Sequence, residues 1–93
     1  MISNNFYLDM QSFSKKVNCF VANGKYTPQK NGKINEYTLY VVNLFNNFSS
    51  PTQEYIDKLV DYAKKNFKFD SAEIANGIRY YWLTFTNLVI EDN

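Results

Sequence analysis

The chain has 93 residues and a net charge of +1, with ten basic and nine acidic side chains. We expect a single small domain over residues 1–93, because this length leaves no room for a second core. The near-neutral balance argues against both a basic protein that coats nucleic acid and a strongly acidic mimic of DNA. Eight phenylalanines, eight tyrosines and one tryptophan supply the buried area that so small a core needs.

Cys19 is the only cysteine, which excludes an intramolecular disulfide and indicates a reducing compartment. No apolar stretch approaches the length of a membrane span, and the N-terminus shows no signal-peptide pattern. We therefore expect a cytoplasmic protein with no membrane partner. The bias toward Asn, Lys, Tyr and Ile is typical of an AT-rich genome, bacterial or phage, so a phage-encoded chain would act in the host cytoplasm.

Residues 1–14 fit two kinds of element. Phe6, Met10 and Phe13 fall on one side of a short helix, whereas Phe6, Leu8 and Met10 alternate as they would in an edge strand. The pattern favours the short helix, or an irregular lead-in.

Residues 17–26 and 34–45 are rich in strand-forming side chains and predict a long β-hairpin. The dipeptide at 31–32 is Asn-Gly, which is typical of a type I′ turn because both residues tolerate positive φ. Pro28 cannot donate a hydrogen bond to a ladder. Residues 27–33 are therefore expected at the hairpin tip.

Residues 51–66 carry the clearest helix pattern. Ser50 can cap the helix, Pro51 suits its first position, and Gln53 completes a capping box. One side of this segment is apolar over an arc of roughly 160°. The apolar side consists of Tyr55, Ile56, Leu59, Val60, Tyr62, Ala63 and Phe67.

A second hairpin is predicted after the helix, from 67–75 and 78–90, with Asn-Gly at 76–77 as its turn. One face of the last strand is apolar, and the other mixes aromatic side chains with threonines, which indicates exposure. The second face carries Tyr80, Trp82, Thr84 and Thr86. The expected fold is an α+β domain: an antiparallel sheet of about four strands, ordered β-hairpin, helix, β-hairpin, with one amphipathic helix packed on one face.

The chain contains no histidine, which removes the commonest general base, the Ser-His and Cys-His pairs and most zinc sites. A lone Cys19 in a strand pattern is more often a small buried hydrophobe than a nucleophile. Glu54, Asp57 and Asp61 line one side of the helix, but lysines interspersed with them indicate a solvated surface. We therefore expect no enzymatic activity, no cofactor and no metal site.

The stretch YTPQKNGKINEYTLYVVN, residues 26–43, leads from a loop with lysines into an aromatic strand. Its YTP and GK turn, followed by an alternating strand that ends in VN, resembles a strand of bacterial single-stranded DNA-binding proteins. The inserted QKN lengthens the turn, and the rest of the chain lacks that family's strand order. An ordinary hairpin with solubilising lysines is the favoured interpretation of this stretch.

The resemblance implies an alternative function, the binding of single-stranded DNA or RNA. Lysines would follow the phosphates, and aromatic rings would stack on the bases. The residues assigned to this function are Lys25, Lys30, Lys33, Tyr40, Tyr80 and Trp82.

The favoured hypothesis is a small non-enzymatic module that binds another protein. Tyr80 and Trp82 suit interface anchors if their face of the sheet is open. Size and composition further favour a phage or mobile-element inhibitor of a host defence nuclease, of the anti-CRISPR type, acting by steric or conformational block. The predicted partner contacts are Tyr26, Lys30, Lys33, Tyr80 and Trp82. A two-fold homodimer through an exposed strand edge is a further hypothesis.

Overall fold

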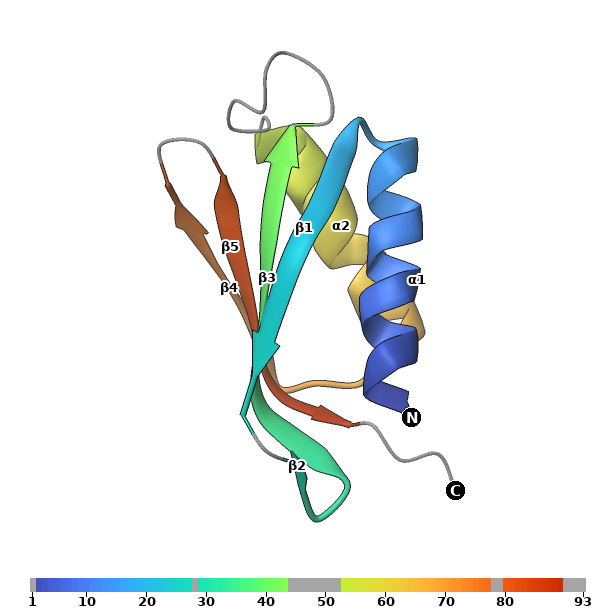
Figure 1. Cartoon of the computed structure of the whole chain (residues 1–93), viewed down its shortest axis with the longest axis vertical. Helices are drawn as coiled ribbons and strands as arrows, with labels where there is room; N and C mark the ends of the chain where they lie inside the picture. The colour runs from blue at the N-terminus through green and yellow to red at the C-terminus, as the bar shows by residue number, and fades with distance from the viewer. Residues whose placement is uncertain (1, 28, 44–52, 78–79, 90–93) are drawn as a thin grey trace.

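A computed structural model describes residues 2–27, 29–43, 53–77 and 80–89. Two helices and a β-sheet make up this part of the chain (Figure 1). In chain order the elements are α1 (Ile2–Lys16), β1 (Cys19–Tyr26), β2 (Gln29–Lys30), β3 (Lys33–Asn43), α2 (Gln53–Asn66), β4 (Ser71–Asn76) and β5 (Tyr81–Val89). All strand pairs are antiparallel, and the order across the sheet is β1-β3-β5-β4, with the short β2 paired to β3. The predicted α+β fold is confirmed.

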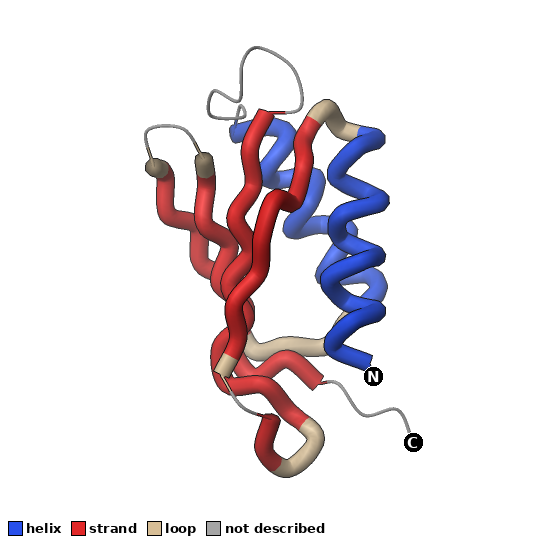
Figure 2. The backbone as a smooth tube through the Cα atoms, in the orientation of Figure 1, coloured by secondary structure: helices blue, strands red, loops and turns tan. Residues whose placement is uncertain are grey.

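Both helices cover the same face of the sheet, so the expectation of a single helix is incomplete (Figure 2). The N-terminal segment forms α1, which confirms the helical interpretation of residues 1–14. Phe6 and Met10 are fully buried, and Phe13 stacks on Tyr62 of α2 with 4.2 Å between ring centroids. The amphipathic side of α1 therefore completes the covering layer together with α2.

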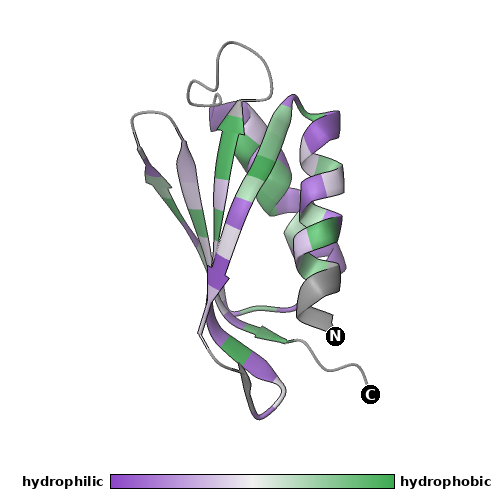
Figure 3. Ribbon diagram, viewed as in Figure 1, coloured by the Kyte–Doolittle hydropathy of each residue, from purple (hydrophilic) through white to green (hydrophobic). Residues whose placement is uncertain are grey.

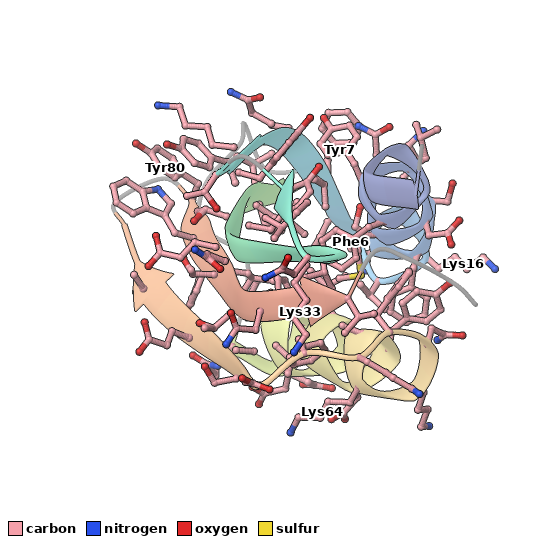
Figure 4. All side chains as sticks on the ribbon, turned by 90° about the horizontal axis from the view of Figure 1, so that it is seen from below. Phe6, Tyr7, Lys16, Lys33, Lys64 and Tyr80 are labelled. Carbon is pink, nitrogen blue, oxygen red and sulfur yellow. The ribbon has the colours of Figure 1, made fainter. Side chains whose placement is uncertain are left out.

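The core lies between the helices and the sheet, and Phe6 is at its centre (Figure 4). Its ring lies 5.0 Å from Tyr37, 4.9 Å from Phe67 and 5.3 Å from Phe85, measured between ring centroids. Edge-to-face and tilted pairs of this kind are favourable beyond the area they bury. Other buried residues of the sheet are Cys19, Val21, Ile34, Leu39, Val41, Tyr81, Leu83 and Leu88.

Helix α2 has the predicted amphipathic character. Ile56, Leu59 and Ala63 are fully buried, while Glu54 and Lys58 form an exposed ion pair at 3.7 Å. Hydrophobic and hydrophilic residues alternate along the helices and strands (Figure 3). Within the described residues, no helix is both long and apolar enough to span a membrane.

The predicted turns and caps have different outcomes. Asn31 and Gly32 have φ values of 54° and 73° and join the paired Lys30 and Lys33, as expected of a type I′ turn. The predicted turn at 76–77 is wrong.

Asn76 belongs to β4, and the Gly77 amide donates a hydrogen bond of 2.8 Å to the Tyr80 carbonyl. Asn76 pairs with Tyr81 in the β4–β5 ladder and the φ of Gly77 is not positive, so these two residues do not form a type I′ turn. The proposed caps Ser50 and Pro51 lie outside the described residues, whereas the Gln53 side chain donates to the Asp57 carboxylate at 2.9 Å.

Candidate interaction surface

The face of the sheet turned away from the helices, here called the open face, carries side chains from all four long strands. The strand register aligns them in rows. One row runs Asn23, Tyr40, Trp82, Ala75, the next runs Lys25, Thr38, Thr84, Glu73, and a third runs Glu36, Thr86, Ser71. Phe20 and Val42 pair beyond the first row, on the side of the β4–β5 turn. The open face therefore has an aromatic end and a polar end.

Three aromatic rings gather at the aromatic end, here called the aromatic cluster: Tyr40, Tyr80 and Trp82. Their centroids lie 5.6 to 5.9 Å apart, and their planes differ by 5° to 20°. Trp82 is 41% exposed, although its ring is flanked by both tyrosines. On β4 the residue paired with Trp82 is Ala75, whose small side chain leaves that side of the indole uncovered. The cluster therefore presents a large aromatic ring that its neighbours already hold in place.

The polar end is ordered but nearly neutral in charge. The hydroxyls of Thr38 and Thr84 form a hydrogen bond of 3.0 Å across β3 and β5. Lys25 follows on one side of this pair and Glu73 on the other, and Glu36 lies one row further along. Within the described rows, two carboxylates thus accompany one lysine.

The structure brings together only part of each predicted site. Tyr80 and Trp82 share the open face, and so do Lys25 and Tyr40 of the nucleic-acid alternative. Tyr26 does not share it, because Tyr26 stacks on the buried Tyr37 at 4.9 Å and so lies on the helix side of the sheet. Its ring is nevertheless 51% exposed at the sheet's rim.

The lysines of the hairpin tip lie far from the aromatic cluster. Lys30 and Lys33 pair with each other across the turn. Lys33 and Tyr40 are seven positions apart on β3, which corresponds to about 23 Å along an extended strand. Lys33 and Tyr80 therefore do not form one compact site.

Sequence reasoning missed the two carboxylates of the open face, Glu36 and Glu73. Alternation within each strand indicates which side chains share a face, but only the pairing of β3 with β5 and of β5 with β4 brings the rows together. Because β3 and β5 are far apart in sequence, no local signal gave their register.

The described residues offer little for catalysis. Cys19 is fully buried, and burial raises the pKa of its thiol from 9.0 to about 11, so the thiol is protonated at neutral pH. No group of three or more His, Cys, Asp or Glu side chains in the described ranges is placed to hold a metal ion. A hollow of about 570 Å³ beside the end of α2 is lined by Lys64, Lys68, Asp70 and Ser71 together with apolar residues.

Comparison of the chain with protein-family models, curated protein sequences and solved structures finds no match. The function is therefore argued from the side chains and their arrangement.

Proposed function

We propose that this chain is a non-enzymatic module that binds another protein through its open face. The observation that carries the proposal is the exposure of Trp82 within the aromatic cluster. Large aromatic side chains give much contact area and have few rotatable bonds, so they are favoured anchors at protein interfaces. Stacking on Tyr40 and Tyr80 further reduces the entropy that Trp82 loses when a partner covers it.

The charges of the open face favour a protein partner over a nucleic acid. Single-stranded nucleic acids bind grooves whose positive charge follows the phosphates. Here Lys25 is accompanied by Glu36 and Glu73, and Lys33 lies well away along β3. The cluster can stack on bases, but the charges of the described residues around it are balanced: Glu36 and Glu73 accompany Lys25, and Lys15 lies over the Phe20 ring at 5.7 Å.

Within this class we retain the prediction of a phage or mobile-element inhibitor of a host defence nuclease in the cytoplasm. A net charge of +1 does not support broad charge mimicry of DNA. Inhibition would instead follow from steric or conformational block, with the aromatic cluster seated against the enzyme. A cleavage assay with the purified nuclease tests this, and unchanged cleavage in a saturating excess of the chain contradicts it.

The binding proposal is tested by capture from a lysate of the cells in which the gene is expressed. Three tagged forms are compared: the unaltered chain, Trp82→Ala, and Leu8→Ala as a matched control on α1, where Leu8 is 54% exposed. We expect a stoichiometric partner with the unaltered chain and with Leu8→Ala, lost with Trp82→Ala and unaffected by nuclease treatment of the lysate.

Equal capture by Trp82→Ala would contradict the role of the open face. Binding that disappears on nuclease treatment would support the nucleic-acid alternative. That alternative also predicts quenching of Trp82 fluorescence by oligonucleotides at low salt, with steep loss of binding as salt is raised.

A further inference from the structure

The two edges of the sheet are protected to very different degrees. At the β1 edge, side chains of α1 satisfy the outward peptide groups of Val21. The side-chain amide of Gln11 donates to the Val21 carbonyl at 2.8 Å, and the Val21 N–H donates to the Ser14 hydroxyl at 3.3 Å. A bulge between Val21 and Asn23 also interrupts this edge. Strand β1 is therefore a poor template for another strand.

Among the described residues, no side chain is seen to bond the outward peptide groups of β4, and its ladder contains no bulge. Strand β4 pairs with β5 on one side and with no described strand on the other, and it lies at the outer edge of the sheet in Figure 1. Its sequence SAEIAN contains no proline and no lysine, and its ladder with β5 runs without a register shift. Ile74 is 40% exposed on this strand. Such an edge is open to strand addition.

The outward peptide groups of β4 follow from its pairing with β5. Gly77 and Tyr80 share a hydrogen bond, and hydrogen-bonded pairs alternate along an antiparallel ladder. Glu73 and Ala75 therefore direct their peptide groups to β5. Ala72, Ile74 and Asn76 direct theirs away from the sheet. These three residues are spaced evenly about Ile74.

We propose that β4 pairs with β4 of a second copy of this chain, antiparallel and with the two-fold axis at Ile74. This register pairs Ile74 with Ile74 and Ala72 with Asn76, so all three outward residues of each copy bond across the axis. It also covers the exposed Ile74 side chains with each other. The inference does not depend on the proposed function, since it concerns a different surface.

The charge of Glu73 favours a two-fold axis at Ile74 over an axis one residue away, at Glu73. An axis at Glu73 would place two like carboxylates directly opposite, which is destabilising. With the axis at Ile74, Glu73 faces Ala75 of the second copy instead.

In this dimer the two sheets form one continuous sheet, and the open faces of both copies lie on the same side of it. A six-residue strand covers less area than a standard interface, so we expect a reversible, concentration-dependent dimer.

Sedimentation velocity over a concentration series tests the dimer, with Ile74→Pro as the disrupting variant. The Ile74 N–H points away from β5, so proline removes an intermolecular donor and leaves the β4–β5 ladder intact. We expect self-association to weaken by about tenfold or more. Circular dichroism verifies that the variant is folded. A wild-type chain that sediments as a monomer throughout, or a folded Ile74→Pro variant that dimerises as well as wild type, overturns the proposal.

Single cysteines test the register independently of the proline variant. In the proposed dimer the two copies of residue 74 face each other with Cα atoms about 5.5 Å apart, within the range of a disulfide. The two copies of residue 71 lie about 20 Å apart. Under mild oxidation Ile74→Cys should form a covalent dimer, and the control Ser71→Cys should not. The native Cys19 is buried and serves as the common background. Equal cross-linking at 71 and 74, or none at 74, contradicts the register.

Discussion

On β5, Leu83 and Phe85 point toward the helices and are fully buried, whereas Trp82, next to Leu83 in the chain, is 41% exposed on the open face. The same backbone thus carries two surfaces of different character. The covered face buries aliphatic and aromatic side chains under two helices, and the open face combines an aromatic cluster with threonines and a few charges. The side chains that stabilise the fold thus lie on one side of the sheet, and the other side is free for recognition.

The largest loss is expected on the covered face, from Phe85→Ala. This change removes ring contacts with Phe6 and Phe69 at 5.3 and 5.0 Å and leaves a cavity in the core. We expect a loss of about 3–5 kcal/mol in the free energy of unfolding, measured by urea denaturation. The neighbour Thr84→Ala, on the open face, should cost only about 0.5–1 kcal/mol through its hydrogen bond to Thr38. Similar losses for both variants would contradict the separation.

The second prediction concerns alkaline pH. Burial raises the pKa of Tyr37 from 10.0 to about 12, with smaller contributions from Tyr26 and Tyr7. Between pH 10 and 12 the folded chain therefore keeps the Tyr37 proton, whereas the unfolded chain releases it. The contribution of Tyr37 to the free energy of unfolding is fully present below pH 10 and falls as the pH rises from 10 toward 12. The expected loss is on the order of 2 kcal/mol. Denaturation measured across this range should show a shallower fall for Tyr37→Phe, and an unchanged slope would contradict the assignment.

The third prediction concerns the close contact of α1 with the sheet at Gly24. A Cβ at this position would lie 3.1 Å from atoms of both Tyr7 and Tyr37. Tyr37 is held between Phe6 and Tyr26 and has little room to move. Gly24→Ala should therefore cost about 1–2 kcal/mol in thermal or urea unfolding. The control Lys25→Ala, one residue away on the open face, should change stability by less than about 0.5 kcal/mol, and an equal effect would argue against the close contact.

The smallest effect on stability is expected from Trp82→Ala, at about 1 kcal/mol, because the indole is only partly buried and loses mainly its stacking on Tyr40 and Tyr80. Binding of the partner protein should nevertheless be lost. Calorimetry of unfolding together with the capture assay measures both effects. A large loss of stability would mean that Trp82 belongs to the core rather than to the recognition surface.

Local patterns predicted most of the fold. The 3.6-residue period gave α2, and alternation on β5 correctly separated Leu83 and Phe85 from Trp82. The start of β1 was less clear, because Val17 continues the apolar alternation of the strand. The structure instead extends α1 to Lys16 and turns the chain at Asn18, whose φ is 61°.

The candidate site was harder to predict than the fold. Tyr80 and Trp82 are identifiable from one strand alone, but Glu36 and Glu73 join them only through the pairing of strands that are distant in sequence. Lys33, a basic residue of the hairpin tip, and Tyr80, an aromatic residue of the last strand, were both predicted to contact the partner. Their turns lie at opposite ends of the β3–β5 ladder, which no property of either segment indicates.

The most direct test of the open face is site-specific photo-cross-linking in the cells that express the gene. A benzophenone amino acid is placed at position 84 in one variant, on the open face beside an intact Trp82, and at position 8 on α1 in the other. We predict a covalent adduct with one protein from position 84 and none from position 8. An adduct from position 8 alone, or only nucleic acid attached at position 84, would contradict protein binding through the open face.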